Sequence, residues 1–181
     1  MSENTIRLSR DVTAVQIPNG NSVHLPAGTG VLITQALGGT YTVVIPHQAG
    51  LYRISGEDAD ALGREKTSVT VAQSGPGTPV TENQIWEVLK SCYDPEIPVN
   101  IVDLGLIYSL TIDSTAQGAV VNVKMTLTAP GCGMGPVIAG DAQKKIAQVP
   151  GVHSAQVDVV WDPPWSPAMI TPEGRKKLGM D

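Results

Sequence analysis

The segment from residue 121 to residue 149 constrains the fold of this chain more than any other. Hydrophobic and polar residues alternate from Val121 to Thr128, which is the period of a β-strand with one buried face. Pro136, a residue favoured in the first turn of a helix, begins a helix-like segment. Between them, glycines stand at alternate positions: Gly131, Gly133 and Gly135. The chain therefore passes from a strand through a glycine-rich turn into a helix.

Cys132 lies inside this turn and is the principal candidate for a functional residue. The unpaired N–H groups and the dipole at the start of a helix favour a thiolate over a thiol. We therefore expect an exposed, acidified Cys132. The alternative is a small apolar residue that fills a tight loop.

The first part of the chain consists of short apolar runs separated by turn signals. Pro18-Asn19-Gly20-Asn21 stands between two of these runs, and Asn-Gly strongly favours a β-hairpin. Ser55 is placed to cap a short helix over residues 57–62 that Gly63 would end, and residues 69–71 are a candidate last strand. Strands at this spacing predict a small antiparallel β-rich domain, a barrel or a roll, over residues 1–72. Residues 73–80, rich in Gly, Pro and Ser, are expected to form a linker.

The second domain is predicted to cover residues 81–181. It opens on Thr81-Glu82-Asn83-Gln84, the pattern of a helix capping box. Strands are expected over residues 104–112, 121–128 and 157–161, a helix over 136–149, and a closing helix capped at Thr171. The order α-β-β-α-β indicates a small two-layer α+β domain. Cys92 falls on the apolar face of the first helix, which favours core packing over a role as a ligand.

The first two of these strands are expected to form a hairpin, which would place Asp103 near Cys132. If the turn of this hairpin is centred near residues 115–116, Asp103 lies opposite Thr128 and stands at the same sheet edge as Cys132. A carboxylate beside a thiol raises the pKa of the thiol, whereas a bound metal ion would deprotonate it. Asp103 is therefore either a metal ligand or a residue that shapes the glycine turn by accepting hydrogen bonds. Asp94 and Glu96, in the turn after the first helix, either belong to this site or simply end the helix.

Three motifs in this half of the chain resemble the Fe–S cluster assembly (PaaD-like) domain family: DPEIPVNIVDLGLIY at residues 94–108, LTAPGCGM at 127–134 and DPPW at 162–165. The family includes maturation proteins, and its domain also precedes some P-loop cluster-carrier ATPases. The resemblance covers residues 80–180, and the β-rich first domain points more specifically to one maturation-factor subgroup. It implies a non-catalytic role in maturing or delivering Fe–S clusters, with Cys132 as the key thiol and a contribution from the turn around Asp94, Glu96 and Asp103.

The net charge and the number of cysteines limit the classes of partner and the cellular compartment that we expect. A net charge of −5 argues against nucleic acid or an anionic membrane as the main partner, and no apolar run reaches the length of a membrane span. The chain has two cysteines and opens on a polar segment without the pattern of a signal peptide, so we expect a reducing cytoplasm.

Two cysteines are too few for a stable Fe–S cluster within one chain, because such clusters ordinarily take four protein ligands. A cluster would have to be bridged in a homodimer, or held transiently with a scaffold, carrier or client protein. The leading hypothesis is an accessory factor that uses Cys132 in this way and is not an enzyme. An adaptor that recruits clients without binding metal is the second hypothesis. A thiol enzyme or redox switch is the third, and it lacks a histidine placed to act as the base.

Overall fold

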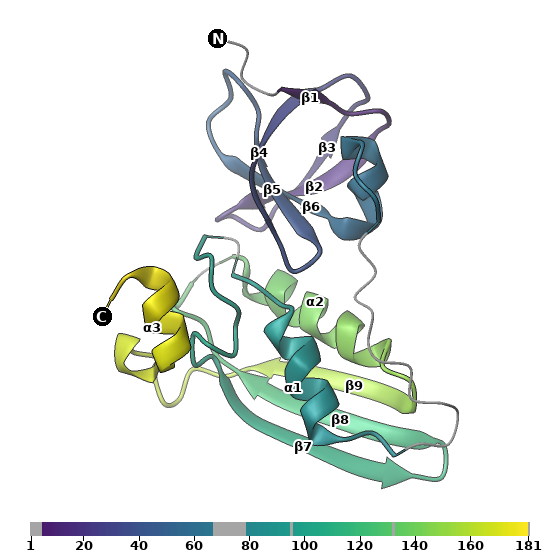
Figure 1. Cartoon of the computed structure of the whole chain (residues 1–181), viewed down its shortest axis with the longest axis vertical. Helices are drawn as coiled ribbons and strands as arrows, with labels where there is room; N and C mark the ends of the chain where they lie inside the picture. Colours follow the sequence, from purple (N-terminus) through teal and green to yellow (C-terminus); the bar gives the residue numbers. More distant parts are fainter. Residues whose placement is uncertain (1–4, 67–78, 95, 132, 181) are drawn as a thin grey trace. The chain divides into compact units, whose positions relative to one another are not determined.

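The computed structural model describes residues 5–66, 79–94, 96–131 and 133–180. The chain separates into two compact units, residues 1–68 and 69–181 (Figure 1). The strand predicted at residues 69–71 and most of the predicted linker lie outside the described residues, so the boundary at residue 72 stays a prediction. Among the described helices, none is both long and apolar enough to cross a membrane.

The first unit is built on a six-stranded sheet in the order β1-β4-β5-β6-β2-β3, in which every neighbouring pair is antiparallel. The strands are β1 (Ile6–Arg7), β2 (Val12–Ile17), β3 (Ser22–Leu25), β4 (Gly30–Leu37), β5 (Thr40–Val44) and β6 (Leu51–Ser55). The antiparallel β-rich character is as predicted, and its closure as a barrel or a roll stays a prediction.

Local sequence signals explain the elements of this unit. The hairpin predicted around Asn19-Gly20 joins β2 to β3, with Val15 paired to Ser22. A short 3-10 helix, η1 (Gly56–Leu62), begins where the Ser55 hydroxyl accepts a hydrogen bond from the Glu57 N–H and ends at Gly63, whose φ is 66°. Both the cap and the stop were predicted. The core beneath the sheet consists mainly of aliphatic residues, among them the fully buried Val31, Val43 and Ile54, together with Tyr41 and Tyr52.

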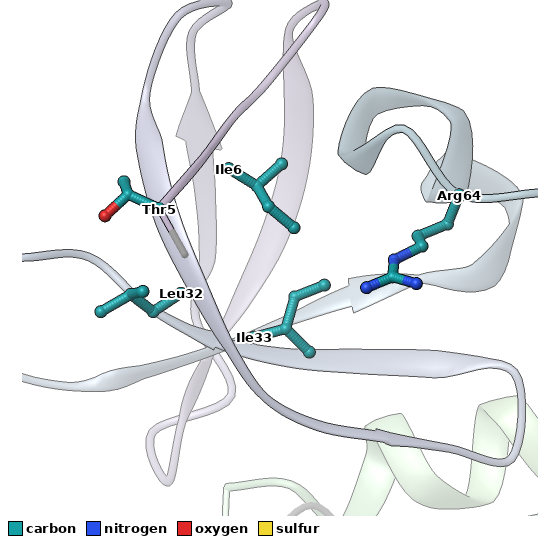
Figure 2. Close-up of a pocket in the computed structure, with 5 residues that line it drawn as sticks. All are labelled: Thr5, Ile6, Leu32, Ile33 and Arg64. Atoms are coloured by element: carbon teal, nitrogen blue, oxygen red, sulfur yellow. The ribbon is translucent and has the colours of Figure 1, made fainter. Parts of the chain in front are cut away.

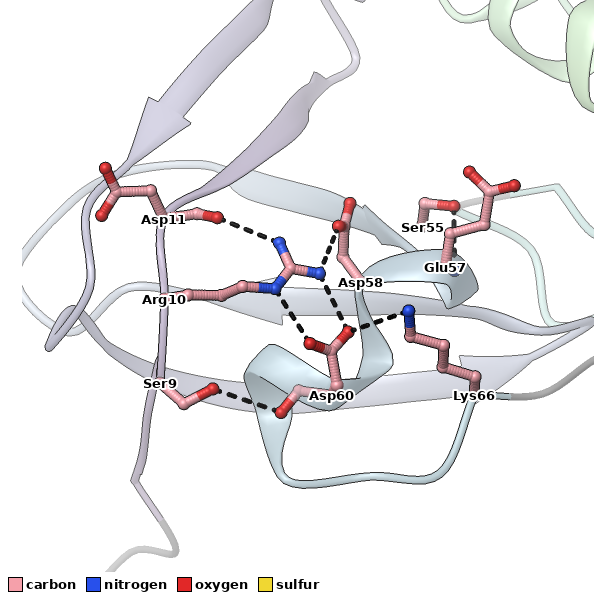
Figure 3. A network of polar contacts seen from close by, with 8 residues as sticks. All are labelled: Ser9, Arg10, Asp11, Ser55, Glu57, Asp58, Asp60 and Lys66. Atoms are coloured by element: carbon pink, nitrogen blue, oxygen red, sulfur yellow. Dashed lines mark hydrogen bonds and ion pairs between the residues drawn. The ribbon is translucent and has the colours of Figure 1, made fainter.

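An ion-pair network ties η1 to the segment between β1 and β2 (Figure 3). The Arg10 guanidinium donates to the Asp58 carboxylate at 2.8 Å and to both oxygens of Asp60 at 2.9 Å. The Lys66 ammonium lies 3.9 Å from Asp60. Arg10, Asp60 and Lys66 are exposed and Asp58 is half-buried, so the network fixes the path of the chain more than it adds to stability.

The second unit follows the predicted order α-β-β-α-β. Its elements are α1 (Glu82–Lys90), β7 (Ile107–Thr115), β8 (Gly118–Met125), α2 (Gly135–Ala147), β9 (Val152–Val159), η2 (Pro167–Met169) and α3 (Pro172–Leu178). β8 pairs antiparallel with β7 and parallel with β9, because α2 serves as the crossover between them. The helices α1 and α2 cover one face of this sheet, which makes two layers (Figure 1).

The two helix caps of this unit were predicted correctly. Thr81 and Gln84 exchange the reciprocal hydrogen bonds of a capping box at the start of α1. The Thr171 hydroxyl accepts from the Gly174 N–H at the start of α3. Two strand boundaries were wrong: β7 begins at Ile107 rather than at Leu104, and Trp161 lies beyond β9 with 48% of its surface exposed.

Candidate functional site

Three segments of the second unit meet at one end of its sheet. The Thr126 N–H, after β8, donates to the Leu106 carbonyl, before β7, at 2.8 Å. The Val160 N–H, after β9, donates to the Met125 carbonyl at 2.7 Å. The glycine loop of residues 126–134, the loop of residues 93–106 and the C-terminal segment are therefore held together here.

The glycine loop joins β8 to α2 as the sequence predicted. Gly131 has a φ of 80°, the left-handed region that favours glycine, and both Gly131 and Gly133 are exposed. Thr128 is half-buried. Cys132 lies outside the described residues, so its exposure and its acidity stay predictions.

Gly135 anchors the far end of this loop. It is the first residue of α2 and is buried. A Cβ atom there would lie 2.5 Å from Leu127 Cδ1, so a larger residue would have to displace the end of the Leu127 side chain. Met134 precedes the helix and supplies no side-chain cap, and Pro136 stands in the first turn as predicted.

Asp103 does not lie opposite Thr128, and that expectation was wrong. Residues 101–105 form turns rather than a strand, with the Leu104 N–H donating to the Asn100 carbonyl at 3.0 Å. The ladder between β7 and β8 ends with Ile107 paired to Met125 and contains a bulge near that pair. Turn hydrogen bonds have replaced the ladder bonds that the alternating pattern suggested.

The Asp103 carboxylate is held by three side chains. Its Oδ2 accepts from Asn100 Nδ2 at 2.8 Å and from Lys177 Nζ at 3.0 Å, and its Oδ1 accepts from Thr171 Oγ1 at 3.3 Å. Burial acts to raise the pKa of the Asp103 carboxyl, but the hydrogen bonds from Lys177, Asn100 and Thr171 and the charge of Lys177 outweigh it and hold this pKa below its ordinary value. The hydrogen bond to Asp103 in turn raises the pKa of Lys177. The pair is therefore ionised at neutral pH.

Backbone contacts hold the C-terminal segment against the same loop. The Thr171 N–H donates to the Asp103 carbonyl, and Trp165 Nε1 donates to the Leu104 carbonyl, both at 2.8 Å. A Cβ atom at Gly174 would lie 2.7 Å from the Asp103 carbonyl oxygen, so α3 can approach this closely only with glycine there. Asp103 thus joins its loop to α3.

Asp94 organises the turn that follows α1. It is 7% exposed, and its Oδ1 accepts from the N–H groups of Glu96 at 2.8 Å and Ile97 at 3.1 Å. This Asx-type turn agrees with the structural alternative for Asp94. Glu96 is exposed, so its carboxylate is accessible to solvent.

Cys92 is 1% exposed, and its Sγ donates to the Val88 carbonyl at 3.7 Å. The predicted core packing of Cys92 is confirmed. Within the described part of the chain, no group of three or more His, Cys, Asp or Glu side chains is placed to hold a metal ion.

The side chains that hold Asp103 were not predicted from the sequence. Asn100 could have been found, because Asn100-Ile101-Val102-Asp103 has the spacing of a capping pattern, and Asn100 Oδ1 accepts from the Asp103 N–H at 2.8 Å. Thr171 was identified only as a helix cap. Lys177 carried no signal at all, because it lies 74 residues from Asp103 and belongs to a basic run that is typical of a solvated helix.

Comparison with known proteins identifies the family to which the second unit is similar. Residues 82–159 match the family model described as "Iron-sulfur cluster assembly protein". The chain is 43% identical over 99 residues to an Fe-S protein maturation auxiliary factor of Porphyromonas gingivalis, a match that covers 55% of this chain and 91% of the relative. The chain belongs to this Fe–S cluster assembly family.

Other proteins match this chain to a similar extent. The maturation auxiliary factor SufT of Staphylococcus aureus is 38% identical over 87 residues, which cover 48% of this chain and 96% of SufT. This match is consistent with the resemblance found in the sequence. A solved domain of unknown function from Bacillus anthracis is 39% identical, with a TM-score of 0.49, and covers 55% of this chain and 92% of its own.

Proposed function

We propose that this protein is an accessory factor in Fe–S cluster maturation, and that Cys132 transiently ligates a cluster or delivers it to client apoproteins. The observation that carries the proposal is the family match over residues 82–159, because this range includes the whole glycine loop and its cysteine. Relatives with 38–43% identity are named maturation auxiliary factors. In this role the cluster is cargo, and the protein is not an enzyme.

The architecture around Cys132 supports this use of the thiol. The residues on both sides of it, Gly131 and Gly133, are exposed, and the helix that follows begins without a side-chain cap. Uncapped N–H groups at a helix start stabilise a nearby anion such as a thiolate. The loop is held at both ends, by the Thr126–Leu106 hydrogen bond and by the packing of Gly135 against Leu127.

The small number of cysteine ligands in each chain explains why cluster binding would be transient. Cys92 is sealed in the core, so each chain offers one cysteine for a cluster that ordinarily needs four protein ligands. Another molecule must complete the set, either a second copy of this chain or a scaffold, carrier or client protein. A cluster held by so few ligands of its carrier is readily released, which suits delivery in a reducing cytoplasm.

Anaerobic reconstitution with iron and sulfide tests the proposal. We expect wild type and Cys92→Ala to gain visible absorbance from bound cluster and Cys132→Ser to gain none, while circular dichroism shows the same fold in all three. Native mass spectrometry of the loaded protein separates a bridged homodimer from a monomer. Iron binding by Cys132→Ser equal to that of wild type would contradict the proposal.

The second candidate is an adaptor that recruits clients to the assembly machinery without binding metal. The engagement of Asp103 favours it, because both oxygens of this carboxylate already accept hydrogen bonds from neighbouring side chains. An adaptor predicts that wild type binds no iron and that Cys132→Ser binds client proteins as well as wild type does. Lower activity of client Fe–S enzymes in cells that carry Cys132→Ser supports the delivery role instead.

A further inference from the structure

One buried hydroxyl of the second unit lacks a hydrogen bond. Thr126 is 1% exposed, and its Oγ1 has no partner within the part of the chain that the structure describes. Its backbone is satisfied, because its N–H donates to the Leu106 carbonyl at 2.8 Å. The other buried polar side chains described in this unit, those of Asp94 and Asn100, both make hydrogen bonds. The Thr126 hydroxyl therefore stands apart, since burying such a group unpaired costs free energy.

The fold gives no reason for a hydroxyl at this position. Thr126 directly follows β8 and begins the glycine loop, and its neighbours Met125 and Leu127 are buried and apolar. A valine would fill nearly the same volume without a polar group that needs a partner. A hydroxyl kept here acts in a state other than the one described, or it binds an ordered water.

The first unit contains a pocket of about 470 Å³ that is lined by Thr5, Ile6, Leu32, Ile33 and Arg64 (Figure 2). None of these lining residues has a buried polar atom without a partner. β1 also leads back into residues 1–4, which lie outside the described residues. The unpaired hydroxyl of Thr126 therefore points more directly to a ligand than this pocket does.

The loop that begins at Thr126 can supply a partner for the hydroxyl. Among residues 126–134, Cys132 is the one with an ionisable side chain. Hydrogen bonds to a charged acceptor are stronger than those between neutral groups, and burial strengthens them further. In Fe–S proteins, hydrogen bonds to the sulfur atoms tune the cluster. Gly131 and Gly133 are exposed, so little packing opposes a change in the path of the loop.

We propose that Thr126 is a positioning residue of the glycine loop, and that its hydroxyl donates a hydrogen bond to an anionic sulfur atom when the loop holds iron. This role rests on the proposed function and adds a residue to it. The hydroxyl is unpaired in the free protein and paired in the loaded one, so Thr126 favours the loaded state. The sulfur is the cysteine thiolate or a sulfide of the cluster, which are alike as acceptors.

Thr126→Val tests this role, because it removes the hydroxyl and keeps the shape of the side chain. In the free protein the unpaired group is gone, so we expect urea denaturation to give an equilibrium constant for unfolding about five-fold lower. In an anaerobic titration with iron and sulfide, followed by absorbance, we expect half-loading to need at least about five-fold more iron than wild type. A residue that only supported the fold would change stability and loading in the same direction.

Thr126→Ser is the conservative variant, and Thr111→Val is the matched control. Thr126→Ser keeps the hydroxyl but loses a buried methyl group, so we expect a less stable free protein that loads iron as wild type does. Thr111→Val makes the same exchange at an exposed residue of β7, and we expect its loading to equal that of wild type.

Titration with iron(II) alone separates the two kinds of sulfur. Weaker iron binding by Thr126→Val without sulfide assigns the hydrogen bond to the cysteine thiolate, whereas an effect that needs sulfide assigns it to the cluster.

Loading of Thr126→Val equal to that of wild type would overturn this role and leave the proposed function standing. A less stable free Thr126→Val would also overturn it, because the hydroxyl would then already have a partner, such as an ordered water, in the free protein. If wild type gains no cluster, the proposed function fails and this role fails with it. A more stable free protein together with weaker loading supports the role.

Discussion

Asp103 is a candidate metal ligand by its sequence, whereas in the structure it connects its own loop to the C-terminal segment. Its carboxylate and its carbonyl both contact the C-terminal segment, through Lys177 and Thr171. The side chain of Asp103 is 14% exposed, and that of Lys177 is 47% exposed. The ion pair is therefore partly screened by solvent, and its contribution to stability is modest.

The lowered pKa of Asp103 predicts a pH-dependent contribution to stability. A carboxyl group with a lower pKa in the folded state stabilises the fold above its unfolded pKa, near 3.9, and loses this effect as the pH falls through its folded pKa. We expect Asp103→Asn to lower the free energy of unfolding of the second unit by about 1 kcal/mol at pH 7, and by progressively less below about pH 4. Urea unfolding across this range measures the difference.

The control for this prediction is the partner residue. Lys177→Met should cost a similar amount at pH 7, and the double variant should cost less than the sum of the two single variants, because both remove one interaction. A cost of Asp103→Asn that stays constant from pH 7 to pH 3 would show that its charge plays no part.

At the scale of elements, α2 and the glycine loop before it depend on close packing as much as on helix signals. Gly135 is buried against Leu127, whereas a Cβ atom at Gly140, further along the same helix, would meet nothing within 4 Å. Close packing therefore restricts the residue at Gly135 and not at Gly140, a difference that the sequence alone does not show.

Alanine substitutions at these two positions should have effects of opposite sign. Gly135→Ala must displace Leu127, so we expect a loss of about 1–2 kcal/mol in the free energy of unfolding. Gly140→Ala meets no obstacle and reduces the freedom of the unfolded chain, so we expect a gain of about 0.5–1 kcal/mol. Chemical denaturation of both variants beside wild type is the measurement, and destabilisation by Gly140→Ala would contradict this account.

At the scale of the whole molecule, the chain consists of two units that each have their own sheet. The first unit has a buried aliphatic core of its own, and the second buries residues of α1, β8 and α2. Relatives of the Fe–S cluster assembly family match over 87–99 residues, which are 91–96% of their own length. A protein of about this size thus exists without a first unit of this kind.

We expect residues 79–181 to fold alone. Calorimetry of this fragment should give one cooperative transition, within about 3 °C of one of two transitions of the full chain, because independent units unfold separately. The fragment should also load iron in reconstitution as the full chain does, since the loop with Cys132 belongs to it. An unfolded fragment, or one melting far below both transitions of the full chain, would show that the units stabilise each other.

The sequence by itself determined the features that depend on neighbouring residues. The capping box at Thr81, the cap at Thr171, the Asn19-Gly20 hairpin and the entry into α2 at Pro136 all arise from hydrogen bonds or dihedral preferences within a few residues. The order of elements in the second unit followed from these signals and from hydrophobic periodicity. The motifs around Cys132 were likewise sufficient to indicate the family.

Only the tertiary structure decided where Asp103 belongs. Asp103 meets Lys177 across 74 residues, and no local pattern records such a contact. The predicted pairing with Thr128 failed because turn bonds and a bulge replaced the ladder before Ile107. Pairings between distant segments depend on the geometry of the loops between them, whereas sequence patterns report mainly what each segment does alone.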